Sequence, residues 1–306
     1  MKLNWKWAVL MVATGLMAAC SGCKKGQGDG GGSAVDSVSK PASLPWPKVP
    51  HSLMSTDDRR RYALNVFWDP LDFSDHSRSL NTAFMEQSFS DFISIMQREP
   101  QPNAPMVKLV TKASADTVAT LFLWSIADKY LNDPNSPMRH GELYRLFLRA
   151  LAETGVATGA YRDRLDYQMK VADLNRPGTV AGDFRFVTRD GVRTSLLAEV
   201  GGKKTLLVFY DPDCDSCKET MAWLSATEMP PALRVIAVDA MDNRALWDST
   251  AATLPAAWLV GFAIDKIEDR QLYHLPAMPT LYLLDERGRV LLKDPTPETA
   301  LSVAAQ

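Results

Sequence analysis

The four cysteines of the chain form two pairs, Cys20/Cys23 and Cys214/Cys217, and two residues separate the members of each pair. Cysteines at this spacing can exchange disulfides or bind zinc. A zinc site that uses both pairs is not expected, because about 190 residues separate them, whereas ribbon-type sites use roughly 15–20. The two pairs therefore need separate interpretations.

The second pair follows a continuous apolar run over residues 205–210, which is typical of a buried parallel strand. A helical pattern then continues to Ser225. A helix that begins at the first cysteine places both sulfurs close together, and its free N–H groups and dipole favour a thiolate on the exposed first cysteine. We expect Cys214 to be the nucleophile that attacks a substrate disulfide and Cys217 to resolve the mixed disulfide.

Acidic residues surround this second pair, at Asp211, Asp213 and Asp215. Negative charges disfavour a thiolate, and a less stable thiolate makes the dithiol less oxidising. Lys218 and the helix end act in the opposite direction. We hypothesise that the dithiol works as a reductant rather than as a strong oxidant.

The first pair lies at the end of a pattern typical of an export signal. Lys2 and Lys6 come first, and residues 7–19 form an uncharged apolar run. This run is shorter than the ~20 residues of a membrane span, but it suits a signal peptide. The small residues before Cys20 resemble a bacterial lipobox. The resemblance implies a signal peptide over residues 1–19 and a lipid on Cys20.

Three alternatives to this lipid attachment remain open: ordinary cleavage after Ala19, an uncleaved anchor, and a lipid on Cys23 instead. Residues 20–55 are rich in Gly, Ser and Pro, which predicts a flexible tether. No acidic run of the kind found in some surface-exported Bacteroidota lipoproteins follows Cys20. We therefore expect a periplasm-facing lipoprotein of the cell envelope, with the outer membrane favoured over the inner membrane.

The composition describes an ordinary folded protein without a nucleic-acid partner. Lys and Arg number 34 against 36 Asp and Glu, so the formal net charge is −2, which provides no basic surface for nucleic acid. Hydrophobic residues make up 46% of the chain. A chain of 306 residues is long enough for about two domains.

Residues 56–177 show apolar residues at helical spacing, which predicts a domain of about five helices. Ser136 and Pro137 match a helix start, and Gly155 matches the end of that helix. We interpret the apolar stripes as core faces and the isolated histidines as structural, so no metal site is expected. The stripes are Phe89, Phe92, Ile93 and Met96; Val118, Leu121, Phe122, Ile126 and Tyr130; and Leu143, Leu146, Phe147, Ala150 and Leu151.

Residues 178–306 alternate between strand and helix patterns, which predicts an α/β sheet. Strands are expected near residues 184–187, 205–210, 233–238, 280–284 and 290–292. Helices are expected after the dithiol, around Trp247 and from Pro297. The predicted fold class is an α-helical N-terminal domain followed by an α/β C-terminal domain.

The C-terminal part resembles the thioredoxin superfamily, and most of all its exported TlpA-type thiol–disulfide oxidoreductases. The resemblance rests on the Cys214/Cys217 pair after a buried strand and on Met278-Pro279-Thr280 before another strand. It implies a thioredoxin-like fold, a cis peptide bond at Met278–Pro279, and substrate backbone bound at these two residues.

The helical part resembles the N-terminal DUF5106 domain, which precedes such modules in Bacteroidota lipoproteins. Residues 62–73 carry this likeness, with the run Phe-Trp-Asp-Pro-Leu-Asp-Phe at its end. The resemblance implies no activity for the helical domain.

The sequence also departs from thioredoxin itself. Asp213 precedes the first cysteine, and Val208 stands where the preceding strand often carries a buried acid. The proton of Cys217 must therefore go to another group or to water. Glu219 is near in sequence, but a solvated helix face is its better interpretation.

These observations predict a periplasmic, membrane-anchored oxidoreductase that reduces disulfides of exported proteins and needs no cofactor. An upstream electron donor in the membrane would be its second partner. A peroxidase is disfavoured, because Asp211 stands where peroxiredoxins carry threonine, and a copper chaperone would use a wider cysteine pair with a histidine. The alternative that remains open is a partner-binding lipoprotein in which the Cys214/Cys217 pair is only a structural disulfide.

Overall fold

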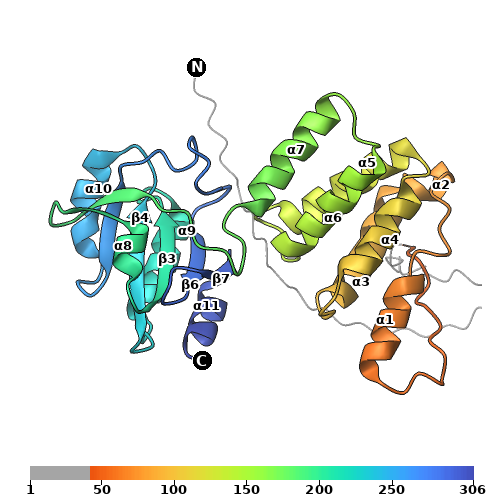
Figure 1. The fold of residues 1–306 in the computed structure, drawn as a ribbon, viewed down its shortest axis with the longest axis horizontal. Helices are drawn as coiled ribbons and strands as arrows, with labels where there is room; N and C mark the ends of the chain where they lie inside the picture. The colour runs from red at the N-terminus through yellow and green to blue at the C-terminus, as the bar shows by residue number, and fades with distance from the viewer. Residues whose placement is uncertain (1–41) are drawn as a thin grey trace, which may run out of the picture. The chain divides into compact units, whose positions relative to one another are not determined.

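The computed structural model describes residues 42–306 of the chain. Residues before Pro177 are helical and those after it form a sheet covered by helices (Figure 1). The prediction of a helical part followed by an α/β part is therefore confirmed. Cys20, Cys23, the predicted signal peptide and most of the predicted tether lie outside the described residues.

The helical part has more helices than the five that the sequence pattern predicted. The three apolar stripes lie in α3, in α5 with η1, and in α6, so none of them covers α1, α2, α4 or α7. The elements are α1 (Thr56–Val66), α2 (His76–Ser79), α3 (Thr82–Met96), α4 (Asn103–Ala113), α5 (Thr117–Ala127), the π-helical turn η1 (Asp128–Asn132), α6 (Gly141–Thr154) and α7 (Ala160–Asp173).

The predicted start of α6 at Ser136–Pro137 is wrong, whereas its predicted end is confirmed. The helix begins after His140, whose imidazole accepts the backbone N–H of Leu143 at 3.3 Å. Ser136 instead donates its hydroxyl to the carbonyl of Tyr130 at 2.6 Å, so it closes the preceding loop. Gly155 ends α6 with a φ of 70°, a conformation that glycine adopts without steric cost.

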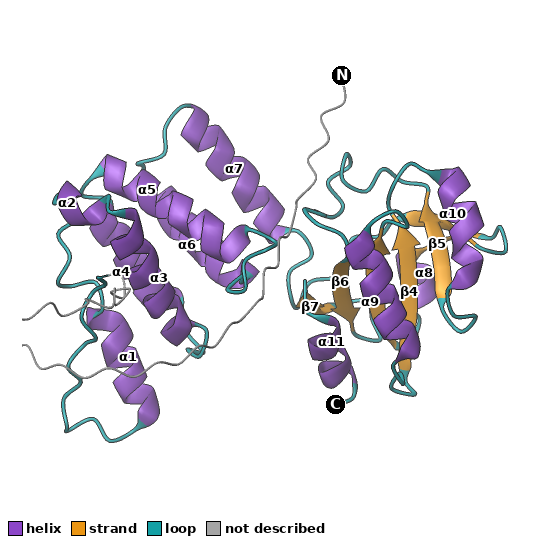
Figure 2. Ribbon diagram, turned by 180° about the vertical axis from the view of Figure 1, so that it is seen from behind, coloured by secondary structure: helices purple, strands orange, loops and turns teal. Residues whose placement is uncertain are grey.

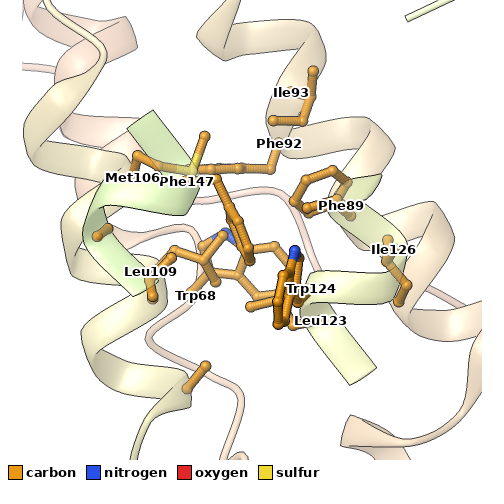
Figure 3. Packing of buried hydrophobic residues seen from close by; sticks show 14 of the residues in the cluster. Trp68, Phe89, Phe92, Ile93, Met106, Leu109, Leu123, Trp124, Ile126 and Phe147 are labelled. Atoms are coloured by element: carbon orange, nitrogen blue, oxygen red, sulfur yellow. The ribbon is translucent and has the colours of Figure 1, made fainter. Parts of the chain in front are cut away.

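Aromatic side chains fill the centre of the helical part. Phe89, Phe92 and Phe147 are fully buried, and Trp68 and Trp124 pack beside them (Figure 3). The ring centroids of Trp68 and Phe92 lie 5.7 Å apart in an edge-to-face arrangement. The predicted stripes of α3 and α6 lie in this common core, but the α5 stripe was misplaced: Val118 is 55% exposed, and α5 is buried mainly through Leu123, Trp124 and Ile126.

The α/β part is built on one seven-stranded sheet with the order β2-β1-β5-β4-β3-β6-β7. The pairs β3/β4 and β4/β5 are parallel, whereas β1/β2, β1/β5, β3/β6 and β6/β7 are antiparallel. The strands are β1 (Arg185–Thr188), β2 (Arg193–Ser195), β3 (Lys204–Tyr210), β4 (Leu233–Asp239), β5 (Leu259–Ala263), β6 (Thr280–Leu284) and β7 (Val290–Lys293).

Helices cover both faces of this sheet. The short helix α8 (Leu196–Val200) packs on one face with a group of buried aromatic rings. Three helices contribute to the core on the other face, where α9 lies in front of the central strands in Figure 2. They are α9 (Asp215–Ala226), α10 (Arg244–Thr250), which the 3₁₀ turn η2 (Ala251–Thr253) extends, and α11 (Pro297–Ala304).

Strands β2 and β5 and helix α8 are the elements that the sequence pattern did not indicate. β5 contains Gly261, which interrupts its apolar run. The glycine is required by packing, because a Cβ at this position would lie 2.3 Å from the ring of Phe186 on the neighbouring strand β1. Among residues 42–306, no helix has the length and apolar character needed to cross a membrane.

Candidate active site

The two cysteines lie where the central strand β3 meets helix α9. β3 is buried from Thr205 to Tyr210, and α9 begins at Asp215 with Cys214 as its N-cap residue. Cys214 is partly exposed, whereas Cys217 is only 1% exposed. Both are free thiols in this structure. The helix N-terminus therefore presents one accessible sulfur and holds the other one turn deeper, as a nucleophile and a resolving thiol require.

The surroundings of Cys217 keep it protonated. Burial raises the pKa of the Cys217 thiol to about 12, and the neighbouring Cys214 and the charge of Asp211 act in the same direction. The backbone N–H of Asp211 donates to the sulfur at 3.4 Å and partly opposes this rise. The buried thiol cannot lose its proton to bulk water at neutral pH, so its reaction needs a base.

The three aspartates around the dithiol have different environments. The Asp215 side chain is 94% exposed and forms an ion pair with Lys218 at 3.1 Å. The side chain of Asp211 accepts the backbone N–H of Asp213 at 2.9 Å. Of the three, only Asp211 contributes to the raised pKa of Cys217. The sequence interpretation treated the three carboxylates as equivalent, but the fold separates Asp211 from the two that solvent screens.

Met278 and Pro279 lie on the exposed side of the dithiol. The Cys214 thiol donates to the carbonyl oxygen of Met278 at 3.6 Å. The Met278–Pro279 peptide bond is cis, as the resemblance implied. Both residues are partly exposed, and the Thr280 hydroxyl fixes the turn by donating to the carbonyl of Ala277 at 2.7 Å. A backbone carbonyl therefore lies at the partly exposed Cys214 sulfur.

A groove of about 420 Å³ opens beside the buried sulfur. Its walls include Cys217 and Met221 of α9, Tyr210 at the end of β3, and Leu254 after η2. The groove is therefore lined mainly by apolar side chains of the face that α9 and α10 cover.

The chain matches the family model described as a domain of unknown function, DUF5106, over residues 19–175. The match covers more than half of the chain. This protein belongs to the DUF5106 family.

Two further comparisons find thioredoxin-like proteins that are similar to this DUF5106 protein. A crystal structure of a thioredoxin-like protein from Bacteroides caccae matches with a TM-score of 0.80 and 28% identity, covering 85% of this chain and 97% of that one. The thioredoxin-like protein YneN of Bacillus subtilis is 32% identical over 120 residues, which are 36% of this chain and 66% of that protein. The match thus spans just under two thirds of YneN. The predicted thioredoxin-like fold is confirmed.

Glu219 and Val208 have the environments that the sequence predicted. Glu219 is on the exposed face of α9, as expected of a solvated helix face. Val208 is buried within the apolar strand β3. Val208 cannot supply a base for the Cys217 proton.

The sequence interpretation missed Asp239, the last residue of β4. It lies beside Tyr210, its partner in the parallel pairing of β3 and β4, and it is fully buried. Burial, with a smaller contribution from the like charge of Asp211, raises the pKa of Asp239 to about 7. The signal was present in the sequence, because a carboxylate that ends a continuous apolar strand lies at the same sheet edge as the dithiol.

Proposed function

We propose that this protein is a thiol–disulfide oxidoreductase of the cell envelope that reduces disulfide bonds in exported proteins. The observation that carries the proposal is the unequal pair at the start of α9, with Cys214 partly exposed at the N-cap and Cys217 buried. The thioredoxin-like names of the related proteins support it.

The reaction begins when the Cys214 thiolate attacks one sulfur of a substrate disulfide. A mixed disulfide forms and one substrate thiolate leaves. Cys217 then loses its proton and attacks the Cys214 sulfur, which releases the second substrate thiol and leaves a Cys214–Cys217 disulfide. The net reaction transfers two electrons from the protein to the substrate, and an upstream donor must return them.

Met278 and Pro279 are the proposed docking residues for an extended substrate segment. The contact between the Cys214 sulfur and the Met278 carbonyl, at 3.6 Å, marks where a substrate backbone would pass the nucleophile. Both residues are partly exposed, so a substrate can reach them.

The proposed location depends on the N-terminal segment. A lipid on Cys20 would anchor the protein, and residues 20–55 would hold the folded part away from the membrane, facing the periplasm. The outer membrane is favoured. Partners would be thiols and disulfides of exported proteins and an electron donor in the membrane. Replacing Cys20 with alanine should move the protein from the membrane fraction to the soluble fraction of fractionated cells, whereas retention in the membrane would contradict the anchor.

The proposed direction of electron flow is reduction. Asp211 disfavours negative charge near the dithiol, which makes the disulfide form harder to reduce and the dithiol a better reductant. Equilibration with defined ratios of reduced and oxidised dithiothreitol measures the potential. A potential close to that of a strong periplasmic oxidant would contradict the reductase direction.

Insulin reduction with dithiothreitol as electron donor tests the activity itself. We expect the wild type to accelerate insulin precipitation and Cys214→Ala to lose this acceleration. Cys217→Ala should accumulate mixed disulfides on Cys214, which a non-reducing gel separates and dithiothreitol releases. Wild-type protein that reduces neither insulin nor a small disulfide would instead favour a partner-binding lipoprotein with a structural disulfide.

A further inference from the structure

The ends of β3 and β4 and helix α10 contribute three buried polar atoms without a hydrogen-bond partner. They are the hydroxyl of Tyr210, one carboxylate oxygen of Asp239 and the indole N–H of Trp247. Such atoms are uncommon in folded proteins, and each calls for a physical reason. Tyr210, Cys217 and Trp247 belong to the same buried cluster, and Tyr210 and Asp239 are paired residues at the ends of β3 and β4.

The carboxylate of Asp239 is only half satisfied. One oxygen accepts the backbone N–H of Met241 at 2.7 Å, and the other has no partner. No basic side chain in residues 42–306 forms an ion pair with Asp239, and the charge that acts on it is the like charge of Asp211. Burial and this repulsion together raise the pKa of Asp239 to about 7. At neutral pH the group therefore exists in both forms and can accept a proton.

Tyr210 lies beside both groups: it is paired with Asp239 across β3 and β4, and it lines the same groove as Cys217. Burial first, and then the charges of Asp239 and of Cys217, raise the pKa of the Tyr210 hydroxyl, so both groups lie within electrostatic range of this phenol. The hydroxyl stays protonated throughout the neutral range. It can therefore accept a proton on its oxygen and donate its own in the same step.

Arg189 and Arg244, two basic side chains near this cluster, bind other groups and do not pair with Asp239. Arg189 lowers the pKa of Tyr210, but its guanidinium donates to four backbone carbonyls, those of Ala251, Leu254, Pro255 and Trp258. Arg244 lies over the ring of Trp247 at 4.8 Å and forms an ion pair with Asp248. The indole N–H of Trp247 lies near enough to the Tyr210 oxygen to lower the pKa of Tyr210 as a weak donor, although the two atoms do not reach the geometry of a hydrogen bond.

We propose that Asp239, acting through Tyr210, takes the proton of Cys217 in the resolving step. The inference rests on the proposed function, since it needs Cys217 to resolve a mixed disulfide. Asp239 is a positioning residue in this scheme, because it acts on the reacting sulfur through the Tyr210 hydroxyl. Asp239 thus supplies the buried acid that related proteins often carry in the strand before the dithiol, where this chain has Val208.

The step balances in protons and electrons. Tyr210 has no direct hydrogen bond to either group, so the transfer runs through water that enters the groove: the Cys217 proton passes by water to the Tyr210 oxygen while the Tyr210 proton passes by water to the Asp239 carboxylate. The Cys217 thiolate attacks the Cys214 sulfur, the new S–S bond forms, and the bond to the substrate sulfur breaks. The substrate leaves as a thiolate with the electron pair of that bond and takes a proton from solvent, and Asp239 later returns its proton to solvent.

Reaction of the reduced protein with 5,5′-dithiobis(2-nitrobenzoate) separates the two steps. The first coloured thiolate is released when Cys214 attacks, at a rate that depends on reagent concentration. The second is released when Cys217 resolves, at a rate that does not. We expect Asp239→Asn to slow the second release by at least about tenfold at pH 7 and to leave the first within about twofold. Tyr210→Phe should slow the second release by at least about threefold.

The pH profile adds a measurement that a merely structural role would not change. The second release in the wild type should become slower as the pH falls through about 7, where Asp239 takes up its proton. Asp239→Asn should lack this inflection. Glu219→Gln is the matched control, because it removes an exposed carboxylate from the same helix as Cys217 and should change neither release.

Three outcomes are distinguishable. A second release that is equally fast in the wild type, Asp239→Asn and Tyr210→Phe, with the same pH profile, overturns the relay alone. A wild type that releases no coloured thiolate overturns the proposed function and the relay together. A slowed second release in Tyr210→Phe supports the relay even if Asp239→Asn fails to fold, which circular dichroism detects.

Discussion

Each part of the molecule contains a buried tyrosine beside an aspartate, and the two pairs differ in how their polar atoms are used. In the helical part, Asp128 accepts from the hydroxyl of Tyr144 at 2.6 Å and from the side chains of Asn132 and Gln168 at 3.0 and 3.2 Å. Arg164 forms an ion pair with its other oxygen at 2.6 Å. In the α/β part, Tyr210 and one oxygen of Asp239 have no partner.

The difference teaches how to separate structural from reactive polar groups when the residue types are the same. Asp128 is charge-compensated and fully bonded, so it stabilises the packing of η1, α6 and α7. Asp239 has neither a counter-charge nor full bonding, so it destabilises the fold when ionised and is free to exchange a proton. The two carboxylates should therefore respond to substitution with opposite signs.

The largest expected effect is on Asp239. Its pKa is about 7 in the folded protein against 3.8 as the ordinary value, so the unfolded chain releases this proton at lower pH than the folded protein. The contribution of Asp239 to wild-type stability should therefore fall as the pH rises from about 4 to 7 and stay reduced above it. Asp239→Asn removes this penalty and should raise the unfolding free energy at pH 8 by about 2–4 kcal/mol.

Urea denaturation of the reduced protein across this pH range measures the effect. Below about pH 4 the wild type and Asp239→Asn should have similar stability, because Asp239 is protonated in both the folded and the unfolded chain. Measurements stop near pH 8, so that ionisation of Cys217 in the unfolded chain does not contribute. Equal pH dependence in the two proteins would show that Asp239 is solvated in the folded state.

The substitution Asp128→Ala should act in the opposite direction. It leaves the Tyr144 hydroxyl, which is almost fully buried, and the Arg164 guanidinium without their acceptor. We expect a loss of about 2–3 kcal/mol in unfolding free energy, because removal of one member strands buried donors. Urea denaturation at pH 7 measures it, and an unchanged midpoint would contradict the structural role of this cluster.

The two tyrosines provide a smaller and cleaner contrast, since each substitution removes only a hydroxyl. Tyr144→Phe breaks a bond to a charged acceptor and should lower the unfolding free energy by about 1–2 kcal/mol. Tyr210→Phe removes a hydroxyl that has no partner. This substitution should change the unfolding free energy by less than about 0.5 kcal/mol, or raise it. Urea denaturation at pH 7 compares the two variants. A substantial loss in Tyr210→Phe would mean that its hydroxyl is bonded in solution.

The strands next to the dithiol could be predicted from sequence because each is a short, continuous apolar run. The run over residues 205–210 becomes β3, and residues 280–284 become β6 with the predicted bounds. β5 was missed because Gly261, which its packing on Phe186 requires, breaks the apolar run. The start of α6 was misplaced because histidine is a rare N-cap, whereas Ser-Pro is a common helix start.

The candidate site was predictable where spacing alone determines it. Cys214 and Cys217 are neighbours in sequence, and Met278-Pro279 follows from the resemblance. Asp239 was not found: its place at the end of an apolar run was visible, but that signal does not say which strand lies beside β3 or on which face of that strand the side chain falls. Both follow from the sheet order and register rather than from any local pattern.

The smallest expected effect distinguishes the aspartates next to the dithiol. Asp211 raises the pKa of Asp239, whereas Asp215 is exposed and paired with Lys218. Asp211→Asn keeps the oxygen that accepts the Asp213 N–H but removes the charge. The pH midpoint of the stability loss, measured by urea denaturation, should therefore move down, because the Asp239 carboxylate forms more easily without a like charge nearby.

Asp215→Asn is the matched control for this shift, because it removes one carboxylate from the same loop and helix start without changing the charge that Asp239 faces. Its pH midpoint should equal that of the wild type, and its unfolding free energy should change by less than about 0.5 kcal/mol, as for an exposed ion pair. Equal shifts in both variants would mean that net charge around the dithiol, rather than the position of Asp211 beside the buried cluster, sets the proton affinity of Asp239.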